Sequence, residues 1–109
     1  MSRPDDLRLD DIREAADQLA EIVAGGRDEF DRDWTRQRAT ERLLEIIGEA
    51  SSALSEQYRS TRSSVPWRHI INLRHLLAHN YHRVDMEQLW TIAASEIPRL
   101  LDEINSPSY

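Results

Sequence analysis

The chain has 109 residues, no cysteine and a formal net charge of −6 at pH 7. Its length fits a single domain over residues 1–109, and without cysteine it can form neither disulfide bonds nor thiolate metal sites. The charged N-terminus and the lack of an apolar run near the ~20 residues that span a bilayer predict a soluble, cytoplasmic protein with no membrane association.

Apolar residues recur at the three- and four-residue spacing of helices along most of the chain, and β-branched runs are absent. This periodicity predicts four main helices over about 6–24, 35–58, 66–79 and 86–104, with room for a short extra helix near 27–33. Four amphipathic helices joined by short links predict an all-α, up-and-down bundle.

Several residues are placed where helices begin or bend. Asp5 or Asp6 can cap the first helix. Pro66 suits the first turn of the third helix, where its missing N–H costs nothing. Asp85 can cap the fourth helix, in which Pro98 should produce a kink or a looser last turn.

Charge is unevenly distributed along the chain. Residues 1–56 carry 15 acids and 8 arginines, residues 57–84 carry 5 arginines and no acid, and residues 85–109 carry 5 acids and 1 arginine. The middle segment contains RHLLAHNYH, residues 74–82, which holds three of the four histidines. A basic strip in an acidic protein is a candidate anion-binding face.

The three histidines of this stretch admit a metal-binding hypothesis. In a continuous helix, His75, His79 and His82 would share one face, and a His-x3-His pair has sound zinc geometry. However, the segment has no carboxylate, and Arg74 and Arg83 would place a cation in a positive field. We expect no metal and keep this hypothesis as an alternative.

The same residue types also suit acid–base chemistry. A histidine such as His79 can give or take a proton near neutral pH, and an arginine such as Arg74 can hold a phosphate and stabilise its transition-state charge. Cleavage of RNA by attack of the 2′-hydroxyl needs such groups and no metal. The two residues are five apart, about 140° round a helix, so they converge only if the arginine reaches around or the helix opens near 78–80.

A structural reading of these residues stays open. Arg74 could pair with Glu45 or Glu49 of the second helix while His79 caps the end of the third. Tyr81 could be a core residue, or it could present its hydroxyl beside His79.

The string from Arg74 through His79 to Tyr81 matches the Arg-x4-His-x-Tyr motif of the HEPN superfamily. The flanking strings LEIIGEA, VPWRHI, HNYHRVD and LWTIAASEIPRL resemble the HepT branch, which comprises the toxins of HEPN/MNT toxin–antitoxin pairs. The resemblance covers about residues 7–104.

This resemblance implies an all-α homodimer in which the two motifs face each other across a shared cleft. The implied activity is metal-independent endoribonuclease cleavage of tRNA or mRNA, without a cofactor. The implied partner is a nucleotidyltransferase antitoxin of the MNT type, which silences the toxin by transferring AMP to the motif tyrosine.

By the same resemblance, Arg74 is the phosphate clamp, His79 the general acid or base, and Tyr81 the AMP acceptor or a substrate contact. Relatives often carry a polar residue such as Asn where this chain has His75. The candidates for an auxiliary role are His75, Asn80, His82 and Arg83. A non-catalytic module that binds a nucleotide or a partner protein is the alternative function.

Overall fold

The computed structural model describes residues 3–79 and 85–106, and within these ranges it contains helices and turns but no strand. In chain order the elements are α1 (Arg3–Ala24), α2 (Arg27–Arg32), α3 (Trp34–Ala53), α4 (Glu56–Ser60), α5 (Trp67–His79), α6 (Met86–Thr91), the π-helical turn η2 (Ile92–Glu96) and α7 (Ile97–Asn105). The predicted all-α fold is confirmed, and α2 is the short extra helix expected near 27–33.

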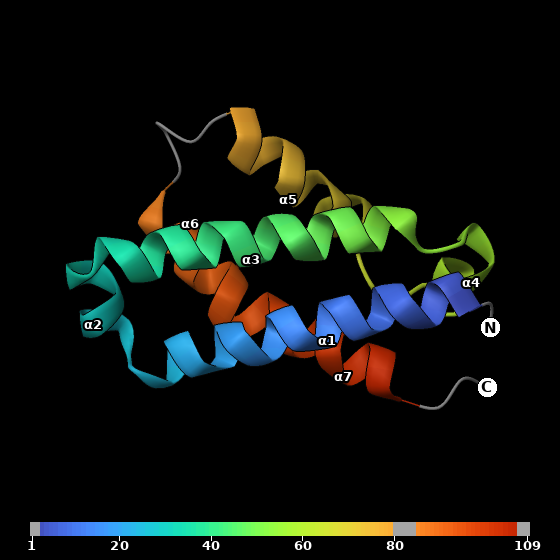
Figure 1. Cartoon of the computed structure of the whole chain (residues 1–109), viewed down its shortest axis with the longest axis horizontal. Helices are drawn as coiled ribbons and strands as arrows, with labels where there is room; N and C mark the ends of the chain where they lie inside the picture. Colours follow the sequence, from blue (N-terminus) through green and yellow to red (C-terminus); the bar gives the residue numbers. More distant parts are fainter. Residues whose placement is uncertain (1–2, 80–84, 107–109) are drawn as a thin grey trace.

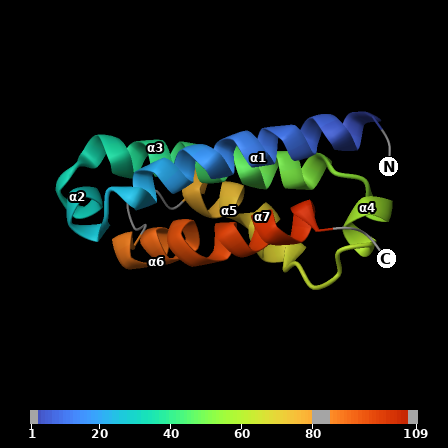
Figure 2. The ribbon, with the colours of Figure 1, turned by 90° about the horizontal axis from the view of Figure 1, so that it is seen from below.

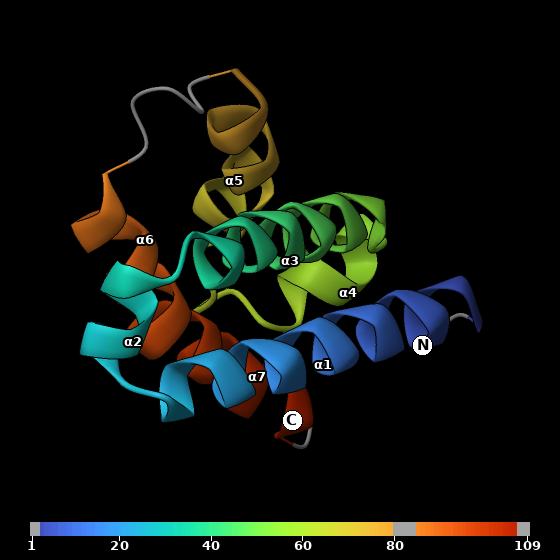
Figure 3. The same cartoon turned by 60° about the vertical axis from the view of Figure 1, so that its left-hand side comes forward.

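The helices α1 and α3 lie side by side and run in opposite directions (Figure 1). Helix α5 packs on the other side of α3 from α1, where it projects from the body of the molecule (Figure 3). The continuous segment from α6 through η2 to α7 runs along α1 and beneath the α1–α3 pair (Figure 2). The long helices therefore alternate in direction, as an up-and-down bundle requires.

The core is formed by the apolar stripes of the four long helical segments, together with Phe30 of α2. The largest fully buried apolar side chains are Leu9, Ile12, Leu19, Phe30, Leu44, Ile47, Ile70, Leu73, Leu89 and Ile97. These stripes bury the inward face of each helix, which is the main source of stability in such bundles. No helix in the described part of the chain is both long and apolar enough to cross a membrane.

The helix predicted over 35–58 is two helices in the structure. Helix α3 ends at Ala53, the backbone is extended at Leu54, and α4 begins after Ser55, whose side chain accepts a hydrogen bond from the Tyr58 N–H. Asp5 holds this break: its carboxylate accepts one bond from the Ser55 N–H and one from the Ser55 hydroxyl, each at 2.7 Å. Asp5 is thus a buried residue in the first turn of α1, where it holds the Ser55 cap of α4 and does not act as the N-cap of its own helix.

The last helical segment shows the disturbance expected from Pro98. Asp85 caps α6 by accepting a hydrogen bond from the Glu87 N–H at 2.9 Å. The π-helical turn η2 then directly precedes the first turn of α7, which contains Pro98. Proline lacks the N–H of the helical ladder and its ring crowds the preceding turn, so a local widening relieves both effects.

We expect Asp5→Ala to lower the free energy of unfolding by about 1–3 kcal/mol, because it leaves two donors of Ser55 without their acceptor. Asp6→Ala is the matched control, since Asp6 is the exposed neighbour, and it should stay within about 0.5 kcal/mol of wild type. Urea unfolding followed by tryptophan fluorescence measures both. Equal stability of the two variants would contradict the role given to Asp5.

Candidate functional site

The start of α5 is fixed against α4 by Trp67. Its indole N–H donates to the backbone carbonyls of Arg59, at 3.1 Å, and of Arg62, at 3.0 Å. Its ring also meets the ring of Tyr58 edge-on, with centroids 6.3 Å apart. Burial raises the pKa of the Tyr58 phenol above its ordinary value. These contacts set where α5 begins, directly after Pro66.

The middle of α5 is fixed against α3 by Gly48. A Cβ atom at this position would lie 3.0 Å from the carbonyl oxygen of Ile70 and 3.1 Å from the backbone nitrogen of Arg74. Both atoms belong to the α5 backbone, so they cannot move aside as the end of a flexible side chain would. The missing side chain of Gly48 therefore lets α5 approach this closely, and it places Arg74 at the contact.

Arg74 is exposed, and it borders an open cavity of about 410 Å³ between α1, α3 and α5. Among the residues that the structure describes, its guanidinium has no hydrogen bond or ion pair. The pairing with Glu45 or Glu49 that the sequence left open is not formed among the described residues. Glu45 pairs with Arg42 of its own helix at 3.5 Å, and Glu49 lines the same cavity as Arg74, as does Asp11, without an ion pair to the guanidinium. The Arg74 guanidinium is left to bind an anion.

The arginines of α5 lack the ion pairs that most described arginines of α1, α2 and α3 form. Six arginines in the described residues form ion pairs with Asp or Glu, and all six lie before residue 57: Arg8, Arg13, Arg27, Arg36, Arg38 and Arg42. Helix α5 carries Arg68 and Arg74, and neither has a carboxylate partner within residues 3–79 and 85–106. The positive charge of α5 is therefore not compensated locally.

The other predicted site residues are only partly covered by the structure. His75 is exposed on α5, one residue after Arg74. His79 is the last residue of α5, and its side chain is outside the described part. Residues Asn80, Tyr81, His82 and Arg83 also fall outside it. The structure thus places Arg74 and His75 on one helix, and the roles of all these residues stay predictions.

The metal-binding alternative is not tested by the structure. Within residues 3–79 and 85–106, no group of three histidine, aspartate or glutamate side chains is arranged to hold a metal ion. The hypothesis of His75, His79 and His82 uses side chains outside these ranges, so it stays open.

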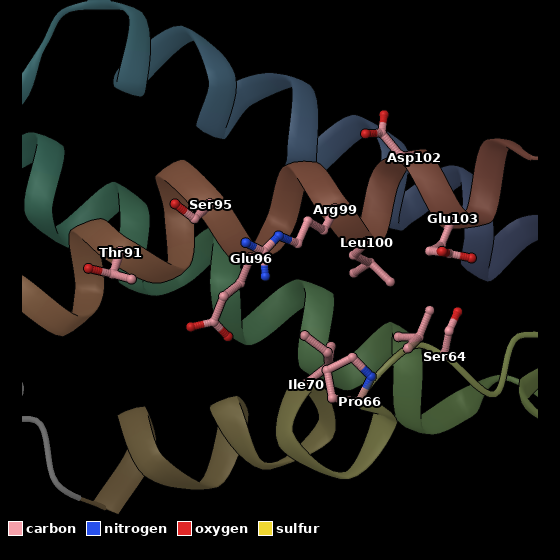
Figure 4. A pocket seen from close by; sticks show the side chains of 11 residues that line it. Ser64, Pro66, Ile70, Thr91, Ser95, Glu96, Arg99, Leu100, Asp102 and Glu103 are labelled. Atoms are coloured by element: carbon pink, nitrogen blue, oxygen red, sulfur yellow. The ribbon is translucent and has the colours of Figure 1, made fainter.

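A second hollow, about 800 Å³ in volume, lies between the start of α5 and the η2–α7 segment (Figure 4). Its lining includes Pro66 and Ile70, while Glu96, Asp102 and Glu103 place three carboxylates around it against the one positive charge of Arg99. We call this hollow the acidic groove. Its charge repels a polyanion such as RNA, so a phosphate site is expected on the other faces of α5.

Two residues that shape the site were missed from the sequence. His69 lies within 2.6 Å of Glu96 at the acidic groove, a contact across 27 residues that no local pattern signals. Gly48 did have a signal, because a glycine inside a helix costs about 1 kcal/mol relative to alanine and so suggests a close approach.

Comparison with known proteins identifies the family. The family described as "Ribonuclease HepT-like" matches this chain over residues 12–106. "Putative RNase MJ1380" of Methanocaldococcus jannaschii is 34% identical over 97 residues, which cover 88% of this chain and 89% of the relative. "Putative RNase TTE0752" of Caldanaerobacter subterraneus is 36% identical over 97 residues, which cover 88% of this chain and 87% of the relative. No solved structure matches the chain.

A third relative, "Probable ribonuclease HepT" of Thermococcus cleftensis, is 36% identical over 93 residues and covers 84% of both chains. The chain belongs to the HepT-like ribonuclease family of the HEPN superfamily. Both the family and the names of its relatives support a ribonuclease activity.

We expect Gly48→Ala to destabilise the protein by about 1–3 kcal/mol, because the added methyl group must push the α5 backbone away from α3. Gly25→Ala is the control, since there a Cβ meets chiefly the flexible end of the Arg36 side chain. Denaturant unfolding compares the two. An alanine at position 48 that stabilised the protein, as in an ordinary helix, would show that the backbones are not in close contact.

Proposed function

We propose that the protein is a metal-independent endoribonuclease that acts on tRNA or mRNA in a cleft between two copies of the chain. The observation that carries this proposal is the exposed Arg74 guanidinium, held at the α3–α5 contact with no acidic partner among the described residues. Membership of the HepT-like ribonuclease family supplies the reaction class.

The proposed chemistry is attack of a ribose 2′-hydroxyl on the adjacent phosphorus. One imidazole takes the proton of the 2′-hydroxyl, the bond from phosphorus to the 5′-oxygen breaks, and a second imidazole protonates that oxygen, leaving a 2′,3′-cyclic phosphate. Arg74 binds the phosphate and stabilises its developing charge. Two-fold symmetry supplies two copies of His79, so acid and base need not come from one helix.

The proposal extends to regulation as the toxin of a toxin–antitoxin pair in the cytoplasm. Its support is the resemblance of the chain to the HepT branch. The partner is an MNT-type nucleotidyltransferase that transfers AMP from ATP to the hydroxyl of Tyr81, with release of pyrophosphate. AMP at that position adds a bulky anion close in sequence to Arg74, where it would compete with the phosphate of the substrate.

A non-catalytic nucleotide- or partner-binding module is the second candidate function. It is favoured by the same uncompensated charge of α5, because holding a phosphate requires the arginines but not proton transfer by His79.

We expect purified wild-type protein to cleave RNA in the presence of EDTA, and His79→Ala to lose about 10²- to 10⁴-fold in rate because proton transfer is lost. The assay uses folded, dimeric, AMP-free protein, and Asp6→Ala serves as an active control. Activity that EDTA abolishes would favour the metal-binding alternative. No cleavage by any variant would favour the binding module.

We expect Tyr81→Phe to retain cleavage and to escape silencing, because it lacks the hydroxyl that accepts AMP. Mass spectrometry after incubation with the nucleotidyltransferase and ATP should show a gain of one or more AMP groups on wild type and none on the variant. A Tyr81→Phe protein that is still modified and silenced would place the acceptor at another residue.

A further inference from the structure

The outward face of α5 carries a stripe of polar residues that the proposed function does not use. Arg68, Asn72 and His75 are all exposed and follow one another by four and three residues. This spacing aligns them on one face of a helix, opposite the buried residues Leu73 and Leu77. The residues Arg68 and His75 span two turns of the helix, or about 10 Å.

The charge of this face comes from Arg68. Its guanidinium is exposed, and among the described residues it has no hydrogen bond and no carboxylate partner. The nearest residue along the helix with an acidic contact is His69, which meets Glu96 on the side of the acidic groove. Arg68 thus marks the start of a basic, acid-free face that leads along α5 towards the predicted catalytic end.

We propose that Arg68 binds a backbone phosphate of the RNA substrate, and that the strand follows the outward face of α5 past Asn72 and His75. The proposal rests on the RNA-cleaving function proposed above. Arg68 would bind the strand away from the bond that is cleaved, about 10 Å from His75. It is therefore a binding residue that extends the substrate contact beyond the phosphate held by Arg74.

RNA fits this face better than a protein partner does. A guanidinium offers paired donors to phosphate oxygens, and the amide of Asn72 can both donate to and accept from the edge of an unpaired base. The acidic groove along one flank repels the strand and so confines it to the outward face. A protein partner would need acidic residues of its own, and it becomes an outcome of the test.

The test compares two substitutions that each remove one exposed, unpaired arginine. Arg68→Gln removes the proposed contact, and Arg99→Gln removes a matched arginine at the acidic groove, which also has no partner among the described residues. Both are made in a His79→Ala background, so that the strand stays intact. Binding of a labelled single-stranded RNA oligonucleotide is measured by fluorescence anisotropy over a range of salt concentrations.

We expect Arg68→Gln to reduce the slope of log affinity against log salt by about 0.7, the value for one phosphate contact on a single strand. This slope corresponds to a loss of affinity of about fivefold at 0.1 M salt. Arg68→Lys should keep the slope, and Arg99→Gln should match its parent. Equal affinity and slope for Arg68→Gln and Arg99→Gln would overturn the proposal.

Two further readouts separate this proposal from the others. If Arg68→Gln sedimented as a different oligomer from wild type while its RNA affinity stayed unchanged, the face would contact a second copy of the chain. That result would overturn the proposal. Cleavage is measured with His79 restored. A wild type that binds through Arg68 without cleaving would refute the catalytic function alone, and a cleaving wild type indifferent to Arg68 would refute this inference alone.

Discussion

At Gly48 the backbones of α3 and α5 touch with no side chain between them, and the candidate site depends on this contact. Helix α5 packs mainly on α3 and projects from the rest of the bundle, so few other contacts can hold it in place. A larger residue at position 48 would have to push the α5 backbone away from α3. Any shift there moves Arg74 directly, because the backbone of Arg74 forms part of the contact.

The distribution of ion pairs separates two uses of arginine in one acidic protein. Most described arginines on α1, α2 and α3 pair with carboxylates, mostly three or four residues away in sequence. Exposed pairs of this kind contribute only about 0–1 kcal/mol each, so leaving α5 without them costs little stability. The gain is a local positive potential on a chain of net charge −6, which directs an anion to one helix.

Local patterns predicted most of the fold and only part of the site. The helical periodicity placed the long helices, the short helix α2 and the disturbance near Pro98, because each depends on neighbours in sequence. The break at Leu54 and Ser55 was missed because it depends on Asp5, 50 residues away. The pairing of Arg74 with Glu45 that the sequence left open does not form, because helical spacing gives Glu45 a partner within its own helix.

The hydrogen bonds of Asp5 connect the first turn of α1, through α4, to the start of α5. Asp5 holds Ser55, Ser55 caps α4, and the carbonyl of Arg59 in α4 receives the indole N–H of Trp67, where α5 begins. The first turn of α1 thus helps to fix the position at which α5, the helix that carries Arg74, begins. A truncation that removed the first turn of α1 would therefore also remove the support of Ser55, and it would loosen the start of a helix that lies more than 60 residues further along the chain.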